Sequence, residues 1–255
     1  MGDLESRRTS FNDVASLYDE VRPGYPEVVI DDIASFAGLG TASRILEIGC
    51  GTGQITLPFA VRGHQILALE PGKALAALAT RKCALYPNVR VCEMTFEEWA
   101  VPGQIFDLVL SAQAFHWIEP YAGCRKAATT LRSGGTIALV WNNDVSQETP
   151  FYKATQPIYD TYMPRDSSAG WTRADIHVAL RTSGAFDEIQ EIRHQWEKTY
   201  SCNEYIKLLH THSDHHRLPE PAKTGFFRAI RDVIVNNGGT VARKYGTQIV
   251  LARRL

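Results

Sequence analysis

A glycine-rich segment from Glu47 to Gly53 (EIGCGTG) carries the clearest chemical signal in the sequence. It follows one apolar run and precedes a second, from Ile55 to Val61. Glycines at a strand-to-helix turn let the backbone come close to a ligand, and they present N–H groups at the start of the helix. The segment therefore predicts a loop that binds a nucleotide-like molecule.

The details of this loop distinguish between cofactors. A dinucleotide-binding loop with the pattern GxGxxG would need a third glycine at the position of Gln54. Glu47, two residues before the first glycine, would repel a diphosphate but would attract a ligand that carries an ammonium and a sulfonium. The charge pattern therefore favours S-adenosylmethionine (SAM) over NAD.

A second acidic residue, Glu70, ends the next predicted strand a short distance after the glycine loop. A carboxylate in this place can accept hydrogen bonds from both hydroxyl groups of a ribose. Pro71 and Gly72 then turn the chain. We predict that Glu70 holds the cofactor's ribose; the alternative is that it only caps the following helix.

The elements that position these residues alternate over the first 140 residues. Short apolar runs rich in β-branched residues predict strands, and segments of helix-forming composition lie between them, such as Lys73–Cys83 and Tyr121–Leu131. This alternation indicates βαβ units, which form a parallel sheet with helices on both faces. The five predicted strands are Arg44–Gly49, Gln65–Glu70, Val89–Cys92, Phe106–Ser111 and Thr136–Trp141.

Helices are predicted before this region at Phe11–Tyr18 and Pro26–Ala37, with prolines between them that break a continuous helix. After it, Asn143–Ala169 is expected to be irregular and polar. The remaining predicted elements are helices at Thr172–Thr182, Asn203–Ser213 and Pro221–Asn236 and strands at Glu188–Tyr200 and Thr240–Leu251.

We predict a single domain over residues 1–255. Its parts would be an N-terminal helical lid (1–40), a SAM-binding core (41–142), an inserted cap (143–187) and closing strands and helices (188–255).

Several motifs together resemble those of the class I SAM-dependent methyltransferases. They are the glycine loop with its acid, Glu70 after the second strand, and Phe106–Val109 (FDLV) before a loop. The chain is most similar to one branch, the small-molecule methyltransferases related to trans-aconitate methyltransferase. That closer likeness rests on Tyr18–Pro26 (YDEVRPGYP), Thr95–Trp99 (TFEEW) and Ala114–Trp117 (AFHW), and it covers nearly the whole chain.

The resemblance implies a Rossmann-like, doubly wound α/β fold with a seven-stranded sheet, mostly parallel with an antiparallel last strand. SAM would lie across the carboxyl ends of the first, second and fourth strands. Thr95 and Phe96 would border the adenine, although Thr95 stands where related enzymes often have an acid. The cofactor-binding residues implied are Tyr18, Arg22, Glu47, Gly49, Cys50, Gly51, Gly53, Gln54, Glu70, Pro71, Thr95, Phe96, Ser111, Ala112 and Gln113.

Methyl transfer from SAM is an in-line displacement, so the protein mainly aligns the acceptor and excludes water. A base is needed only if the acceptor must lose a proton. His116 is the candidate base or acceptor-orienting residue, and the alternative is a buried structural histidine. The residues expected to contact the acceptor are Tyr25, His116, Trp117, Trp141 and Asn142.

The N-terminal segment is expected to fold over the cofactor. Arg22 could bind a carboxylate of SAM or of the acceptor through its guanidinium fork. Tyr18 could pack beside the sulfonium as a cation–π partner. The alternative is a surface salt bridge between Arg22 and Glu20 or Asp19.

Composition limits the other function classes. The formal net charge of −1 offers no excess positive charge for a nucleic acid backbone. No apolar stretch is long enough to span a membrane, and the N-terminus lacks the apolar run of a signal peptide. Five scattered cysteines without CxxC spacing suit reduced thiols in a cytoplasm. The histidines His210, His212, His215 and His216 have no third ligand in a fixed place, so no metal site is predicted.

The sequence thus predicts a cytoplasmic methyltransferase, a monomer or homodimer, that converts SAM and a small acceptor into S-adenosylhomocysteine and a methylated product. A carboxylate or hydroxyl oxygen is favoured as the methylated atom, with nitrogen next. Two alternatives are a catalytically inactive SAM-binding protein and an NAD-dependent oxidoreductase.

Overall fold

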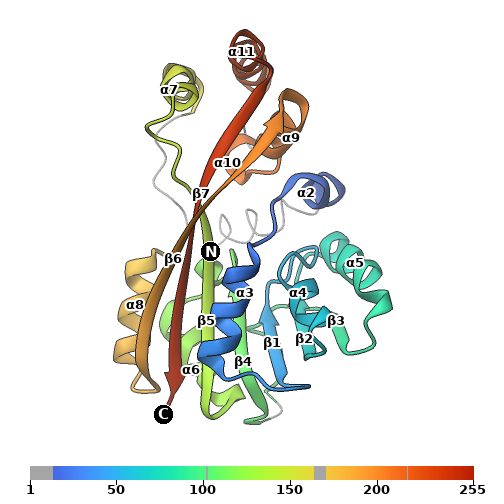
Figure 1. Ribbon diagram of the computed structural model, residues 1–255, viewed down its shortest axis with the longest axis vertical. Helices are drawn as coiled ribbons and strands as arrows, with labels where there is room; N and C mark the ends of the chain where they lie inside the picture. Colours follow the sequence, from blue (N-terminus) through green and yellow to red (C-terminus); the bar gives the residue numbers. More distant parts are fainter. Residues whose placement is uncertain (1–13, 102, 164–170, 217) are drawn as a thin grey trace.

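The structure is a computed structural model that describes residues 14–101, 103–163, 171–216 and 218–255 (Figure 1). It contains one seven-stranded sheet with the strand order β3-β2-β1-β4-β5-β7-β6. The strands are β1 (Arg44–Ile48), β2 (Gln65–Glu70), β3 (Val89–Glu93), β4 (Phe106–Ala112), β5 (Leu131–Asp144), β6 (Phe186–Ser201) and β7 (Thr240–Arg254). β1 to β5 pair in parallel, whereas β7 runs antiparallel to both β5 and β6. The predicted fold class, with its antiparallel last strand, is confirmed.

Helices cover both faces of this sheet because consecutive strand residues point in opposite directions. Ile45 packs into a core beneath α3 (Glu27–Ala37), α4 (Thr56–Val61) and α5 (Lys73–Lys82), whereas its neighbour Leu46 packs into the core on the other face. That second core includes buried residues of α6 (Pro120–Thr130) and α8 (Arg173–Thr182). α8, in the segment predicted as an inserted cap, therefore covers the sheet.

A third core lies beyond the sheet, where β6 and β7 continue upward as a two-stranded ribbon (Figure 1). Buried residues such as Tyr200, Ile206 and Phe226 form this core. The helices around it are α2 (Ala15–Val21), α7 (Pro150–Tyr162), α9 (Cys202–His210), α10 (Ser213–His216) and α11 (Ala222–Asn236). The ribbon thus joins the sheet to a helical layer above the carboxyl ends of the parallel strands.

The prediction of an irregular segment at Asn143–Ala169 is wrong over most of its described part. β5 continues to Asp144, and α7 occupies Pro150–Tyr162. Thr149 caps this helix because its side chain accepts a hydrogen bond from the Tyr152 N–H, and a proline fits the first turn of a helix. The apolar face of α7 packs into the third core. Residues 164–169 and the start of the helix predicted at Phe11–Tyr18 lie outside the described residues.

No helix in the described ranges combines the length and the apolar character that a membrane crossing requires.

Candidate functional site

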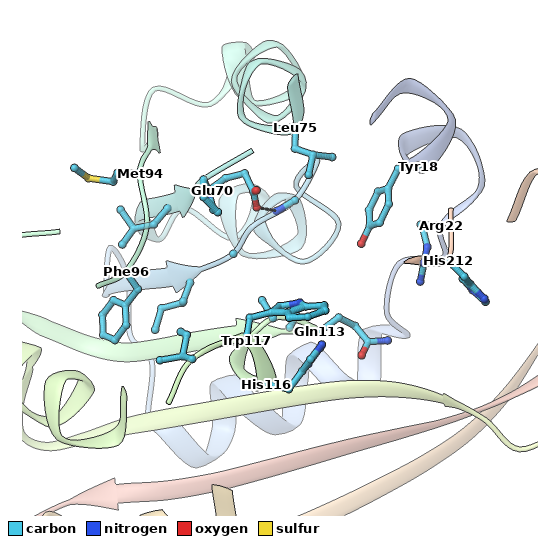
Figure 2. A pocket seen from close by; sticks show the side chains of 18 of the residues that line it. Tyr18, Arg22, Glu70, Leu75, Met94, Phe96, Gln113, His116, Trp117 and His212 are labelled. Carbon is cyan, nitrogen blue, oxygen red and sulfur yellow. Dashed lines mark hydrogen bonds between the residues drawn. The ribbon is translucent and has the colours of Figure 1, made fainter. Parts of the chain in front are cut away.

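Two adjacent cavities lie at the carboxyl ends of β1, β2 and β4, beneath the helical layer. The first has a volume of about 280 Å³ and the second about 210 Å³. Both are lined by the glycine loop, Gln113 and the helical-layer residues Tyr18, Arg22 and His212. Figure 2 shows that Tyr18, Arg22 and His212 lie at one end of the first cavity and Met94 and Phe96 at the other.

The glycine loop has the backbone conformation that its sequence predicts. Gly49, Gly51 and Gly53 adopt φ angles of 69°, 57° and 90°, a region that other residues rarely occupy. A Cβ atom on Gly49 would lie 2.4 Å from the Cβ atom of Ala114, so the loop after β4 leaves no room for a side chain. Glycine at position 49 is therefore required both by its backbone angle and by the space available.

Glu70 connects this loop to the end of β2. Its carboxylate accepts hydrogen bonds from the Gly51 N–H at 2.9 Å and the Gly72 N–H at 2.8 Å. The side chain is buried but lines the first cavity, as Figure 2 shows. Because Gly72 is the N-cap residue of α5, Glu70 braces both the glycine loop and the start of this helix.

Glu47 lies on the other side of the loop and lines the second cavity. Its side chain is only 1% exposed, and neither carboxylate oxygen has a hydrogen-bond partner among the described residues. Burial raises the pKa of this carboxyl to about 7, and the nearby Thr56 hydroxyl opposes this rise only in part. Buried polar groups in proteins are nearly always paired, so the second cavity offers a site for a ligand that donates hydrogen bonds or carries positive charge.

Arg22 holds α2 against the end of α9. Its Nε donates to the Thr211 hydroxyl and its Nη2 to the Thr211 carbonyl, both at 2.8 Å. Its guanidinium carbon lies 5.0 Å from the centre of the Tyr18 ring. The predicted alternative of an Arg22 salt bridge with Asp19 or Glu20 is wrong.

The two acids have other partners. Asp19 pairs with Lys82 at 2.5 Å and Glu20 pairs with Lys207 at 2.5 Å. Arg22 therefore lines both cavities instead of forming a surface ion pair.

The loop after β4 forms the floor of the cavities. Gln113 has a φ angle of 58°, and its side-chain amide donates to the Asn142 carbonyl at 2.9 Å. His116 and Trp117 follow in a short 3-10 helix and line the first cavity (Figure 2). Burial, reinforced by the charge of Arg173, lowers the pKa of His116 to about 4. His116 is therefore neutral near pH 7 and can accept a hydrogen bond there.

We expect the His116 ring to show no titration between pH 5.5 and 8, since its pKa of about 4 leaves it deprotonated over this range. Proton NMR of the imidazole resonances, assigned by their loss in the His116→Asn variant, measures this directly. A midpoint near pH 6.5 would instead mean that the ring is solvated and has the ordinary basicity of a histidine.

Most of the predicted site residues gather at these cavities, but four line neither of them. Gly53 and the buried Trp141 are absent from both linings. The Ser111 hydroxyl donates to the Ile48 carbonyl at 3.0 Å within the sheet. The Thr95 hydroxyl donates to the Glu98 carboxylate at 2.8 Å and so stabilises its own turn. The two residues next to Thr95 in the chain, Met94 and Phe96, line the first cavity.

The other predicted residues divide between the two cavities. Pro71 lines the first cavity, Gly49, Gly51 and Ala112 line both, and Tyr25, Cys50, Gln54 and Asn142 line the second.

Several lining residues were not predicted, and they include Arg243 and Tyr245 of β7 in the second cavity. A strand alternates inward and outward side chains, and in VARKY (241–245) the first and last residues face the third core. Arg243 occupies the inward position between them, and this arginine in an apolar pattern could have indicated a site residue.

The histidines between His210 and His216 make different contacts. His210 stacks on Phe227 with ring centres 3.7 Å apart, and His215 packs against Phe226. His212 lines both cavities. Over the part of the chain that the structure describes, no three potential metal ligands come together.

Comparison with known proteins shows what the sheet region is similar to. Residues 45–135 match the family model of a methyltransferase domain. An uncharacterised methyltransferase of Mycobacterium tuberculosis is 35% identical over 133 residues, which are 52% of each protein. The chain thus spans about half the length of this curated relative.

Solved structures share the fold across nearly the whole chain. A proposed type II methyltransferase from Anaeromyxobacter dehalogenans has a TM-score of 0.67 at 21% identity, covering 91% of this chain and 97% of that one. Phosphoethanolamine N-methyltransferase 2 from Haemonchus contortus, in complex with phosphomonomethylethanolamine and S-adenosylhomocysteine, has a TM-score of 0.58 at 14% identity, covering 95% and 57%.

Proposed function

We propose that this protein transfers a methyl group from SAM to a small-molecule acceptor, and that the two cavities hold the donor and the acceptor. The observation that carries the proposal is the buried, unpaired carboxylate of Glu47 beside the glycine loop. An ammonium group is the natural partner for such a carboxylate, and SAM carries one on its methionine part. A nicotinamide dinucleotide would instead place its negatively charged diphosphate beside this loop.

The residues of the first cavity fit the rest of SAM. Glu70 ends β2 with its carboxylate at the cavity wall, suited to ribose hydroxyls. Met94, Phe96 and Ile118 offer an apolar surface for the adenine. Arg22 donates its Nε and Nη2 to Thr211 but lines both cavities, so its positive charge is suited to the carboxylate of the methionine part. When bound, SAM supplies an activated methyl group to the acceptor.

The protein's own contribution is to orient the acceptor and exclude water. The helical layer covers the cavities, with Tyr18 and His212 closing one end (Figure 2). His116, neutral near pH 7, can accept a hydrogen bond from an acceptor hydroxyl or amine. A base with a pKa of about 4 removes a proton only from an acidic group, so acceptors that are ionised or readily ionised suit this site.

We further propose that the methylated atom is a carboxylate or hydroxyl oxygen of the acceptor, with a nitrogen atom as the second choice. Trans-aconitate is one candidate within the branch that the sequence resembles. We also propose that the protein is cytoplasmic, that it is a monomer or a homodimer, and that it acts without nucleic acid or membrane partners.

Calorimetric titration with S-adenosylhomocysteine (SAH), with NADH as the control ligand, tests the donor site. SAH at about a hundred times its dissociation constant should stabilise the protein by roughly 2.7 kcal/mol, and a rise in melting temperature should accompany binding. Absence of SAH binding to folded protein would refute the proposal, and binding of NADH instead would favour an oxidoreductase. SAH binding without turnover of labelled SAM on any acceptor would indicate an inactive SAM-binding protein.

A further inference from the structure

An arginine occupies an inward position of β7 where the alternation of the strand calls for an apolar residue. Arg243 lies between Val241 and Tyr245, both of which belong to the third core. Its exposed fraction is 9%, and it lines the second cavity. Burying a guanidinium costs free energy unless charged or polar partners surround it.

The partners present in the protein leave this guanidinium incompletely paired. Its Nη2 lies 3.2 Å from the Asp144 carboxylate, and its carbon lies 5.2 Å from the centre of the Tyr245 ring. Its Nε is buried without a hydrogen-bond partner among the described residues. Asp144 also accepts a hydrogen bond from the Ser146 N–H and does not line the cavity. Within the described ranges, the Nε of Arg243 therefore has no protein acceptor.

The charged residues that line the second cavity exceed those needed to bind the methionine part of SAM. Its lining contains two arginines, Arg22 and Arg243, and one acid, Glu47. If the methionine part of SAM occupies Glu47 with its ammonium and Arg22 with its carboxylate, that pair is neutral. The sulfonium and Arg243, which Asp144 contacts only through Nη2, then remain next to the acceptor space.

The remaining walls near Arg243 are suited to a small polar molecule. Tyr25, His212 and Tyr245 line the same cavity, together with the apolar Leu208. The Tyr245 hydroxyl is 2.7 Å from the Tyr200 hydroxyl, which fixes the ring beside the arginine. A guanidinium fork held by an aromatic neighbour matches a carboxylate or a phosphate, because both present paired oxygens.

We propose that Arg243 binds an anionic group of the methyl acceptor, so that the acceptor is a small organic anion with a carboxylate or phosphate group. This inference rests on the proposed methyl transfer, and it assigns the acceptor subsite to the second cavity. It predicts that neutral molecules of the same shape bind poorly.

The test uses the full chain saturated with SAH and a panel of mono-, di- and tricarboxylates and phosphate monoesters, with the corresponding amides as neutral controls. Binding is measured by calorimetry, and turnover with labelled SAM. We expect at least one anion to bind and its amide not to. Carboxylates and phosphates are scored separately, so the panel also identifies which anionic group the site accepts.

Arg243→Met should weaken binding of that anion at least tenfold while SAH affinity stays within about twofold, since hydrogen bonds to charged groups have effects of this size. Arg243→Met combined with Asp144→Asn removes both charges and guards against a folding defect from an unpaired Asp144. The matched control is Arg253→Met on the same strand, since Arg253 is fully engaged with Glu188, Gly134 and Phe36.

Anion affinity that is unchanged in the double variant would overturn the inference, as would the failure of every anion to bind the SAH-loaded protein. Efficient methylation of the neutral amides by the unaltered protein would do so as well. Absence of SAH binding to the unaltered protein would instead refute the proposed function, so failure of the inference and failure of the proposed function are distinguishable.

Discussion

Glu70→Ala is expected to lower SAH affinity about a hundredfold, because hydrogen bonds to a charged carboxylate contribute about 1.5–3 kcal/mol each. The substitution removes the group suited to the ribose hydroxyls. It also leaves the N–H groups of Gly51 and Gly72 without the acceptor that now holds them at 2.9 and 2.8 Å. The glycine loop therefore loses its brace together with its ligand contact. Calorimetric titration with SAH at pH 8 measures the effect.

Two further variants separate ribose binding from loop support. Glu93→Ala removes an exposed acid at the same level of the neighbouring strand, since Glu93 pairs with Glu70 in the β2–β3 register, and it should leave SAH affinity unchanged. Glu70→Gln keeps one acceptor oxygen and should give an intermediate loss. SAH binding by Glu70→Ala that equals that of the unaltered protein would remove Glu70 from the cofactor site and leave it only a structural role.

The central sheet could be predicted from the sequence because local pattern determines it. Apolar runs of four to six residues between helical segments correspond to β1–β5 within a few residues at each end. The main exception is β5, which starts at Leu131 instead of the predicted Thr136. The glycine loop was predictable for the same reason, since positive φ angles at Gly49 and Gly51 follow from residue type and place in the βα unit.

The helical layer was less accessible to sequence reasoning because distant contacts determine it. α7 begins at a cap, Thr149-Pro150, within a polar stretch, and its apolar residues pack against α11 and α9. The contacts of Arg22 with Thr211 join residues 189 positions apart, and no local pattern indicates such a pairing. The same holds for the second cavity, where β7 brings Arg243 beside the N-terminal segment. Sequence motifs therefore predicted the glycine loop and its surroundings better than the part of the site that β7 contributes.

Glu47→Gln should make the ligand-free protein more stable relative to the unaltered chain as the pH rises. The pKa of Glu47 is raised by burial to about 7, so the folded state holds the proton more tightly than the unfolded state does. Stability is then lost as the pH rises from the unfolded pKa towards the folded one, and the loss is complete above pH 7. The variant lacks this loss. The difference in unfolding free energy between variant and unaltered protein should therefore grow by about 2–3 kcal/mol from pH 5 to pH 8.

The same substitution should weaken SAH binding at pH 8 by about a hundredfold, because a buried ammonium would lose its charged partner. In the unaltered protein SAH should bind about tenfold more weakly at pH 6 than at pH 8, since only about a tenth of Glu47 is ionised at pH 6. The variant should show no such pH dependence. Denaturant unfolding at both pH values, combined with SAH titrations, measures both effects on one pair of proteins. A Glu47→Gln variant that gains no stability with pH yet binds SAH normally would mean that the Glu47 carboxylate neither destabilises the fold nor binds the cofactor. If the stability gain and the binding loss appear together, the unpaired buried acid is a cost to the fold that is maintained for the ligand.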